Sequence, residues 1–158
     1  MKWTKYIIPG FIVYMIQLWL SEFLSINTIR PDFCVILILY WSVKDGRFAG
    51  TVAGFIIGLL VDLSGAGSFF GLSPMAYSIT GYVGGYLKGL YTKLSPFYFT
   101  LSWIGILCFQ FLIVSLVMYQ DLLVEDLALF WLKWIATASY TLGFAGILQV
   151  IFPIYRLS

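Results

Sequence analysis

Six long runs of apolar residues alternate along this chain with short polar or glycine-containing segments. Within the runs, apolar and polar positions do not alternate. Residues 111–114, for example, are apolar at four successive positions, which excludes the pattern of a membrane β-barrel strand. In lipid, the helix is then the structure that satisfies the backbone hydrogen bonds. We therefore predict an all-α membrane protein with six transmembrane helices, at about residues 6–24, 31–43, 48–63, 74–87, 96–119 and 127–152 of one integral membrane domain, 1–158.

Prolines, serines and glycines mark the ends of the predicted helices. Pro31 suits the first position of the second helix, and Asp32 beside it favours the positive end of the helix dipole. The serine–proline pairs at 73–74 and 95–96 are each typical of an N-cap followed by a first-turn proline. The Ser-Gly-Ala-Gly-Ser segment at 64–68 is expected to end the third helix.

Composition supports a membrane location and argues against an enzyme. The chain is 61% hydrophobic and only 10% charged, whereas soluble domains average about 25% charged residues. A soluble domain of this size could not remove so much apolar surface from water. Histidine is absent, which removes the commonest general base and metal ligand. We expect no catalytic residue, metal or cofactor, and no nucleic-acid partner.

The charged residues separate into two groups when six helices are threaded through a bilayer. With both chain ends in the cytoplasm, one side receives seven of the nine basic residues: Lys2, Lys5, Lys44, Arg47, Lys88, Lys93 and Arg156. The other side receives six of the seven acidic residues: Glu22, Asp32, Asp62, Asp121, Glu125 and Asp126. The basic residues obey the positive-inside rule. We therefore predict a multi-pass inner-membrane protein with both termini in the cytoplasm.

Glycines at a spacing of four occur in two neighbouring helices. Gly50, Gly54 and Gly58 share one face of the third helix, and Gly81 and Gly85 share one face of the fourth. Such faces allow the backbones of two helices to approach closely in lipid. The spacing favours packing of these two helices against each other, and it leaves open the docking of a helix from a partner protein.

Four charged residues are expected near the outer rim of the membrane. The Arg30-Pro31-Asp32 segment is explained by a helix start with interface charges. Asp62 ends the third helix, either as a solvated loop acid, which is slightly favoured, or as a partner of Arg30 or Lys133. Lys133 lies about two turns inside the last helix and can extend outward or pair with an acid. Whether Arg30 and Asp62 pair stays open.

Three glutamines interrupt the apolar runs. Gln17, Gln110 and Gln149 are expected to form hydrogen bonds between helices, because a polar group in lipid needs a partner. The several ionisable groups at mid-membrane depth that are typical of an ion path are missing, which argues against a proton-coupled pump.

The order of these features resembles a known family. The Arg-Pro-Asp segment is followed by an apolar run ending in Leu-Tyr-Trp at 39–41, a basic turn, and then Gly-Phe-x-x-Gly-Leu-x-x-Asp at 54–62. Gly71 then precedes a glycine-rich helix. Over roughly residues 28–90 this order is similar to the rod shape-determining protein MreD family. The positions that match the pattern are Arg30, Pro31, Asp32, Gly54, Gly58 and Asp62.

The resemblance implies a non-enzymatic subunit of the machinery that builds peptidoglycan during cell elongation. Members of the family associate with the single-span protein MreC, and through it with the actin-like MreB filament. They also act with the RodA-type glycosyltransferase and its transpeptidase. The resemblance further implies a fold similar to the substrate-binding subunits of energy-coupling-factor vitamin transporters, and structural or partner-contacting roles for the matching residues.

Two other functions remain open on sequence grounds. A vitamin or small-molecule transporter subunit would need an outward cavity lined by polar and aromatic groups, to which Arg30, Asp62 and Trp131 could contribute. An integral membrane enzyme is less favoured, because histidine and clustered acids are missing. The sequence does not decide which helix face contacts which partner, whether the chain self-associates, or whether a lipid-linked precursor binds.

Overall fold

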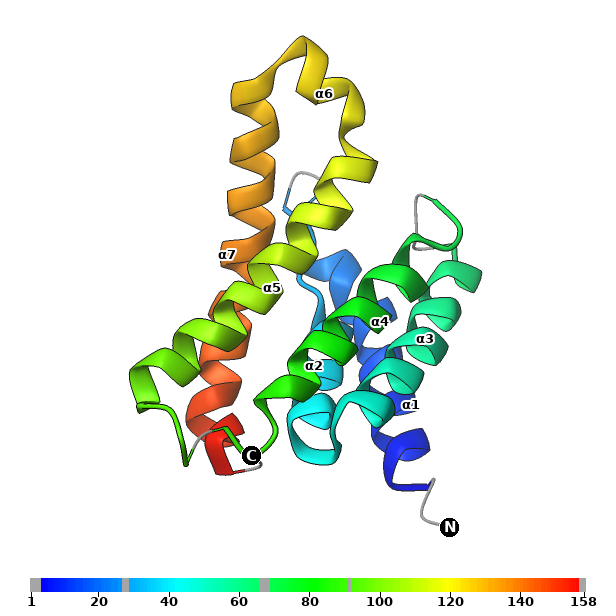
Figure 1. Ribbon diagram of the computed structural model, residues 1–158. Helices are drawn as coiled ribbons and strands as arrows, with labels where there is room; N and C mark the ends of the chain where they lie inside the picture. The colour runs from blue at the N-terminus through cyan, green and yellow to red at the C-terminus, as the bar shows by residue number, and fades with distance from the viewer. Residues whose placement is uncertain (1–3, 27–28, 66–68, 91, 157–158) are drawn as a thin grey trace.

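A computed structural model describes residues 4–26, 29–65, 69–90 and 92–156, and these residues form seven α-helices and two short 3-10 helices (Figure 1). The α-helices are α1 (Thr4–Phe23), α2 (Phe33–Asp45), α3 (Arg47–Leu63), α4 (Leu72–Gly84), α5 (Pro96–Met118), α6 (Gln120–Glu125) and α7 (Leu127–Ile151). The 3-10 helices are η1 (Gly85–Leu87) and η2 (Ile154–Arg156). The predicted all-helical class is confirmed. Lys2 and residues 66–68 of the predicted helix break lie outside the described residues.

Six of the helices run alternately up and down, so that both ends of the described chain lie at the same end of the molecule (Figure 1). α5 and α7 contain 23 and 25 residues and are long and apolar enough to cross a membrane, whereas the apolar stretch Thr4–Leu20 of α1 is somewhat shorter. The short α6 joins α5 to α7 at the end opposite the termini.

The centre of the molecule is α2. Val35, Ile38, Leu39 and Val43 are completely buried, because α2 contacts α1, α3, α4 and α7. Its apolar side chains point in all directions, as expected for a helix that is surrounded by other helices. α2 therefore forms the core around which the other elements pack.

α3 and α4 pack with their backbones in contact. A Cβ atom added to Gly50 would lie 2.6 Å from the carbonyl oxygen of Gly81, and one added to Gly58 would lie 2.5 Å from the Cα atom of Pro74. Gly54 faces the carbonyl group of Tyr77 in the same way. The face of α3 that carries these glycines is covered by α4 and is not open to a partner.

The remaining glycine of the predicted set lies at the end of this interface. Gly85, the first residue of η1, faces the backbone of Arg47 at the start of α3. The turn between α2 and α3 is therefore held against the end of α4. The structure brings all five predicted glycines together along the contact of α3 with α4 and η1.

Two predicted helix starts are wrong. α2 begins at Phe33, not at Pro31, because Asp32 is in an extended conformation and its side chain accepts a hydrogen bond from the Val35 N–H at 3.0 Å. α4 begins at Leu72, ahead of the predicted serine N-cap, with Gly71 as its N-cap. Gly71 has φ +96°, a left-handed conformation that glycine adopts without strain. Ser95 occupies the predicted N-cap position of α5, followed by proline as the first helical residue, but its side chain forms no capping hydrogen bond.

α5 and α7 form a hairpin that packs against α2 and α4. Phe99, Trp103, Leu107 and Phe111 are buried at intervals of four along one face of α5. The other faces of α5 and much of α7 carry exposed apolar side chains. Figure 1 shows the hairpin extending beyond α1–α4 at the end where α6 lies.

Candidate functional site

The segment before α2 joins three other helices through hydrogen bonds. The second carboxylate oxygen of Asp32 accepts a hydrogen bond from the Tyr77 hydroxyl of α4 at 2.7 Å, and the Asp32 N–H donates to Thr141 Oγ1 of α7 at 3.2 Å. On the other side, Gln17 of α1 donates to the carbonyl oxygen of Pro31 at 3.0 Å and accepts from the Phe33 N–H at 2.7 Å. Residues 31–33 therefore fix the relative positions of α1, α4 and α7.

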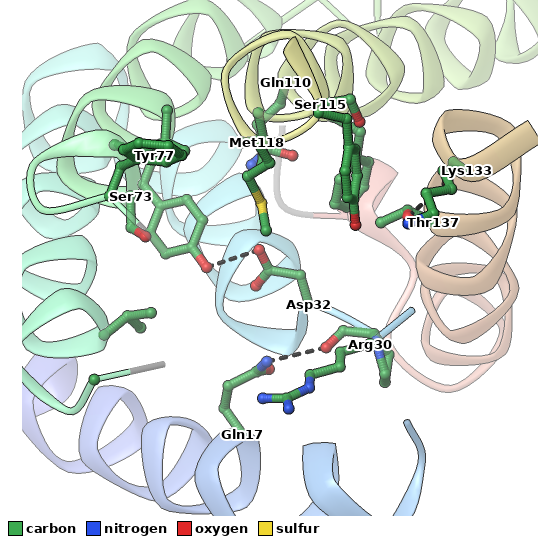
Figure 2. Close-up of a pocket in the computed structure, with 18 of the residues that line it drawn as sticks. Gln17, Arg30, Asp32, Ser73, Tyr77, Gln110, Ser115, Met118, Lys133 and Thr137 are labelled. Atoms are coloured by element: carbon green, nitrogen blue, oxygen red, sulfur yellow. Dashed lines mark hydrogen bonds between the residues drawn. The ribbon is translucent and has the colours of Figure 1, made fainter. Parts of the chain in front are cut away.

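A cavity of about 570 Å³ lies beside this segment (Figure 2). We call it the polar cavity. Its polar side chains come from α1, the segment before α2, α4, α5 and its C-cap, and α7: Gln17, Arg30, Asp32, Ser73, Tyr77, Gln110, Ser115, Tyr119, Lys133 and Thr137. Its apolar side chains include Leu18, Val61, Phe69, Leu72, Val114 and Met118. The polar cavity lies at the end of the helices opposite the chain termini.

Two cationic side chains line the polar cavity from different sides. Arg30 is exposed and extends beneath Asp32 toward Gln17 (Figure 2). The Lys133 ammonium lies 4.6 Å from the centre of the Tyr119 ring, a cation–π distance. The described parts of the chain contain one ion pair, Lys5–Asp45 at 3.0 Å, and it lies at the opposite end of the molecule. Neither cation of the polar cavity is therefore paired with an acid among the described residues.

Asp62 is neither the solvated loop acid nor the ionic partner that the sequence suggested. Its side chain is only 7% exposed, and one oxygen accepts a hydrogen bond from the Gly71 N–H at 2.6 Å. This contact ties the end of α3 to the start of α4. Asp62 forms no ion pair with Arg30 or Lys133 within the described residues, and it lies outside the lining of the polar cavity.

The predicted interhelical role of glutamine is confirmed for Gln17 alone. Gln149 accepts a hydrogen bond from the Ile154 N–H at 2.9 Å, so it stabilises the turn at the end of its own helix. Gln110 is 2% exposed, and its side-chain oxygen has no hydrogen-bond partner among the described residues. The polar cavity therefore contains a buried acceptor without a donor.

The sequence did not predict the roles of Tyr77 and Thr141. Both lie in apolar helices, and their hydrogen bonds reach Asp32 from positions 45 and 109 residues away. One available signal was the polar face of α4, where Ser73, Tyr77 and Thr80 recur at intervals of three and four residues.

A second depression, which is almost entirely apolar, runs between α1 and α3. It has a volume of about 370 Å³ and includes Gly10, Phe11, Ala49, Val52, Ala53 and Ile56. We call it the α1–α3 groove. Gly10, Ala49 and Ala53 leave space between the larger apolar side chains of α1 and α3.

Among the described residues, no three cysteine or acidic side chains gather in a way that could hold a metal ion.

Comparison with known proteins identifies one family. The model of the rod shape-determining protein MreD family matches residues 2–157. The match confirms the resemblance seen in residues 28–90 and extends it over nearly the whole chain, including the last two long helices. No curated protein and no solved structure matches the chain.

Proposed function

Because this chain belongs to the rod shape-determining protein MreD family, a family of bacterial membrane proteins, we propose that it is a non-enzymatic subunit of the cell-elongation complex that docks an MreC-type protein. A RodA-type glycosyltransferase and its transpeptidase would join the same complex, and MreB would be reached through the MreC-type protein. The fold would be similar to that of energy-coupling-factor substrate-binding subunits.

The proposed topology has six membrane crossings in the cytoplasmic membrane and both termini inside. It is supported by the alternating direction of the helices and by the separation of basic and acidic residues between the two ends. α2 and α4 have 13 residues each and reach only about 20 Å, less than the roughly 30 Å of the hydrocarbon core. This short length is tolerated for α2 because other helices surround it.

The α1–α3 groove is the observation that carries the docking proposal. An MreC-type partner has a single transmembrane helix, and a lipid-exposed groove with small residues allows such a helix to approach closely. The groove contains Gly10, Ala49 and Ala53, and its lining is apolar. The glycine face of α3 is already covered by α4, so the opposite side of α3 is the side that remains for a partner.

Filling the groove tests this assignment. In Ala53→Trp, the indole would occupy the space of the partner helix, and we expect co-purification of the MreC-type protein from detergent extracts to fall by about tenfold. This corresponds to about 1.4 kcal/mol of lost binding free energy. Ala128→Trp, the same substitution at an exposed position of α7, serves as the matched control. Undiminished co-purification by a folded Ala53→Trp protein would contradict docking in this groove.

One observation favours a second candidate, a substrate-binding subunit of a small-molecule transporter. The polar cavity lies at the end of the molecule assigned to the outside, where such a subunit would take up its substrate. The two candidates differ in their partners. A transporter subunit would co-purify with an ATPase pair and a membrane coupling protein. The Ala53→Trp substitution tests docking of the MreC-type protein and does not test binding of these transporter partners.

A further inference from the structure

We infer that the polar cavity binds an anionic headgroup that also carries hydroxyl groups, the chemistry of phosphatidylglycerol. This inference goes beyond the proposed function, since it concerns a ligand and not a protein partner. It rests on the charges that line the cavity, the unpaired acceptor inside it and its apolar walls.

The charge of the cavity favours an anion. Arg30 and Lys133 both line it, and neither has an acidic partner among the described residues. The one carboxylate in the lining, Asp32, already accepts hydrogen bonds at both oxygens, from the Val35 N–H and the Tyr77 hydroxyl. The cavity therefore has an excess of positive charge, and a phosphate would receive charge-assisted hydrogen bonds from it.

A ligand that carries a hydrogen-bond donor could satisfy the unpaired acceptor. The side-chain oxygen of Gln110 is buried and has no partner, and a buried acceptor without a donor is costly. Figure 2 shows Gln110 and Ser115 on the α5 side of the cavity, with Arg30 on the other side. A phosphodiester has acceptors only, whereas the glycerol hydroxyls of phosphatidylglycerol can donate to Gln110.

The remaining walls fit the apolar part of a lipid. Leu18, Phe69, Leu72, Val114 and Met118 line the cavity together with the polar groups. A volume of about 570 Å³ falls within the usual range of roughly 300–1,000 Å³ for small-molecule sites. The same headgroup chemistry is offered by a membrane lipid and by free glycerol phosphate, and the apolar walls favour the lipid.

Native mass spectrometry of the full chain in detergent can measure this binding. The probes are short-chain phosphatidylglycerol, phosphatidic acid, which lacks the glycerol hydroxyls, phosphatidylcholine, and glycerol 3-phosphate. We expect phosphatidylglycerol to bind about tenfold more tightly than phosphatidylcholine, and the difference to shrink as salt is added. Glycerol 3-phosphate binding as tightly as the lipid would instead identify the free anion as the ligand of the same site.

Four variants at three cavity residues locate the site. Arg30→Gln and Lys133→Gln should each weaken phosphatidylglycerol binding by about tenfold, and Arg30→Lys should recover part of the loss. Gln110→Leu should weaken phosphatidylglycerol binding without weakening phosphatidic acid binding. Lys93→Gln is the matched control, because Lys93 is exposed and lies between η1 and α5, outside the lining of the polar cavity.

The inference is overturned if the wild-type protein binds phosphatidylglycerol and phosphatidylcholine equally, whatever the behaviour of the variants. It is also overturned if Lys93→Gln weakens binding as much as the two cavity variants. Gln110→Leu could affect phosphatidylglycerol and phosphatidic acid binding equally, or affect neither. Either result would contradict the proposed contact between Gln110 and the glycerol hydroxyls. None of these measurements uses the MreC-type protein, so their failure is distinct from failure of the proposed docking.

Discussion

Gly54→Ala is expected to lower the free energy of unfolding by about 3 kcal/mol, a large effect for the addition of one methyl group. The added Cβ atom would overlap the carbonyl group of Tyr77, which belongs to the backbone of α4 and cannot rotate away. The two helices would have to separate along the whole contact that Gly50 and Gly58 also form. Unfolding by SDS titration, followed by circular dichroism, measures the change.

Gly143→Ala provides the control for this experiment. Gly143 lies within α7, and a Cβ atom added there meets nothing within 4 Å. Alanine is favoured over glycine in a helix interior by about 0.5–1 kcal/mol, so the control should be neutral or slightly stabilised. Equal stability of Gly54→Ala and Gly143→Ala would show that α3 and α4 are not in backbone contact.

Asp32→Ala is expected to destabilise the protein by about 3 kcal/mol. The substitution removes the N-cap of α2, which costs about 1 kcal/mol. It also leaves the Tyr77 hydroxyl without its acceptor, which costs a further 1–3 kcal/mol or so for a buried donor. The same SDS titration measures the loss of unfolding free energy. Near-ultraviolet circular dichroism reports whether the environment of the aromatic side chains changes.

A second N-cap in the same chain separates the two contributions of Asp32. Asp126 caps α7 by accepting a hydrogen bond from the Leu129 N–H at 3.1 Å, and it is exposed. Asp126→Ala should therefore lose about 1 kcal/mol. A double-mutant cycle of Asp32→Ala with Tyr77→Phe measures the remaining coupling. A loss for Asp32→Ala no greater than for Asp126→Ala would mean that the contact with α4 contributes nothing.

The helices and their order follow from local sequence signals. Apolar runs longer than about 12 residues, punctuated by glycine, proline and charge, locate the elements because each signal acts within a few residues. The spacing of Gly50, Gly54 and Gly58 correctly indicates a close-packing face for the same reason. The start of α2 was predicted wrongly because Pro31 and Asp32 are both compatible with a first helical turn. The hydrogen bonds of Pro31 with Gln17 and of Asp32 with Tyr77 hold both residues outside the helix.

The polar cavity could not be predicted in this way. Its lining comes from five helices and from segments between helices, and the pairing of Asp32 with Tyr77 and Thr141 depends on how distant helices meet. Asp62 shows the same limit, since its position at a helix end suggested solvent whereas the fold buries it against Gly71. Sequence spacing identifies the face on which a residue lies, but not the element that covers that face.

The central position of α2 has a consequence for the order of assembly during synthesis. α2 is made second, yet its surroundings include α7, which is made last, and Thr141 of α7 accepts the hydrogen bond from the Asp32 N–H. A newly inserted α2 therefore has neighbours on only part of its surface until the final helix arrives. α2 is therefore fully surrounded only once α7 has been made, so a chain truncated before α7 would lack one wall of its core.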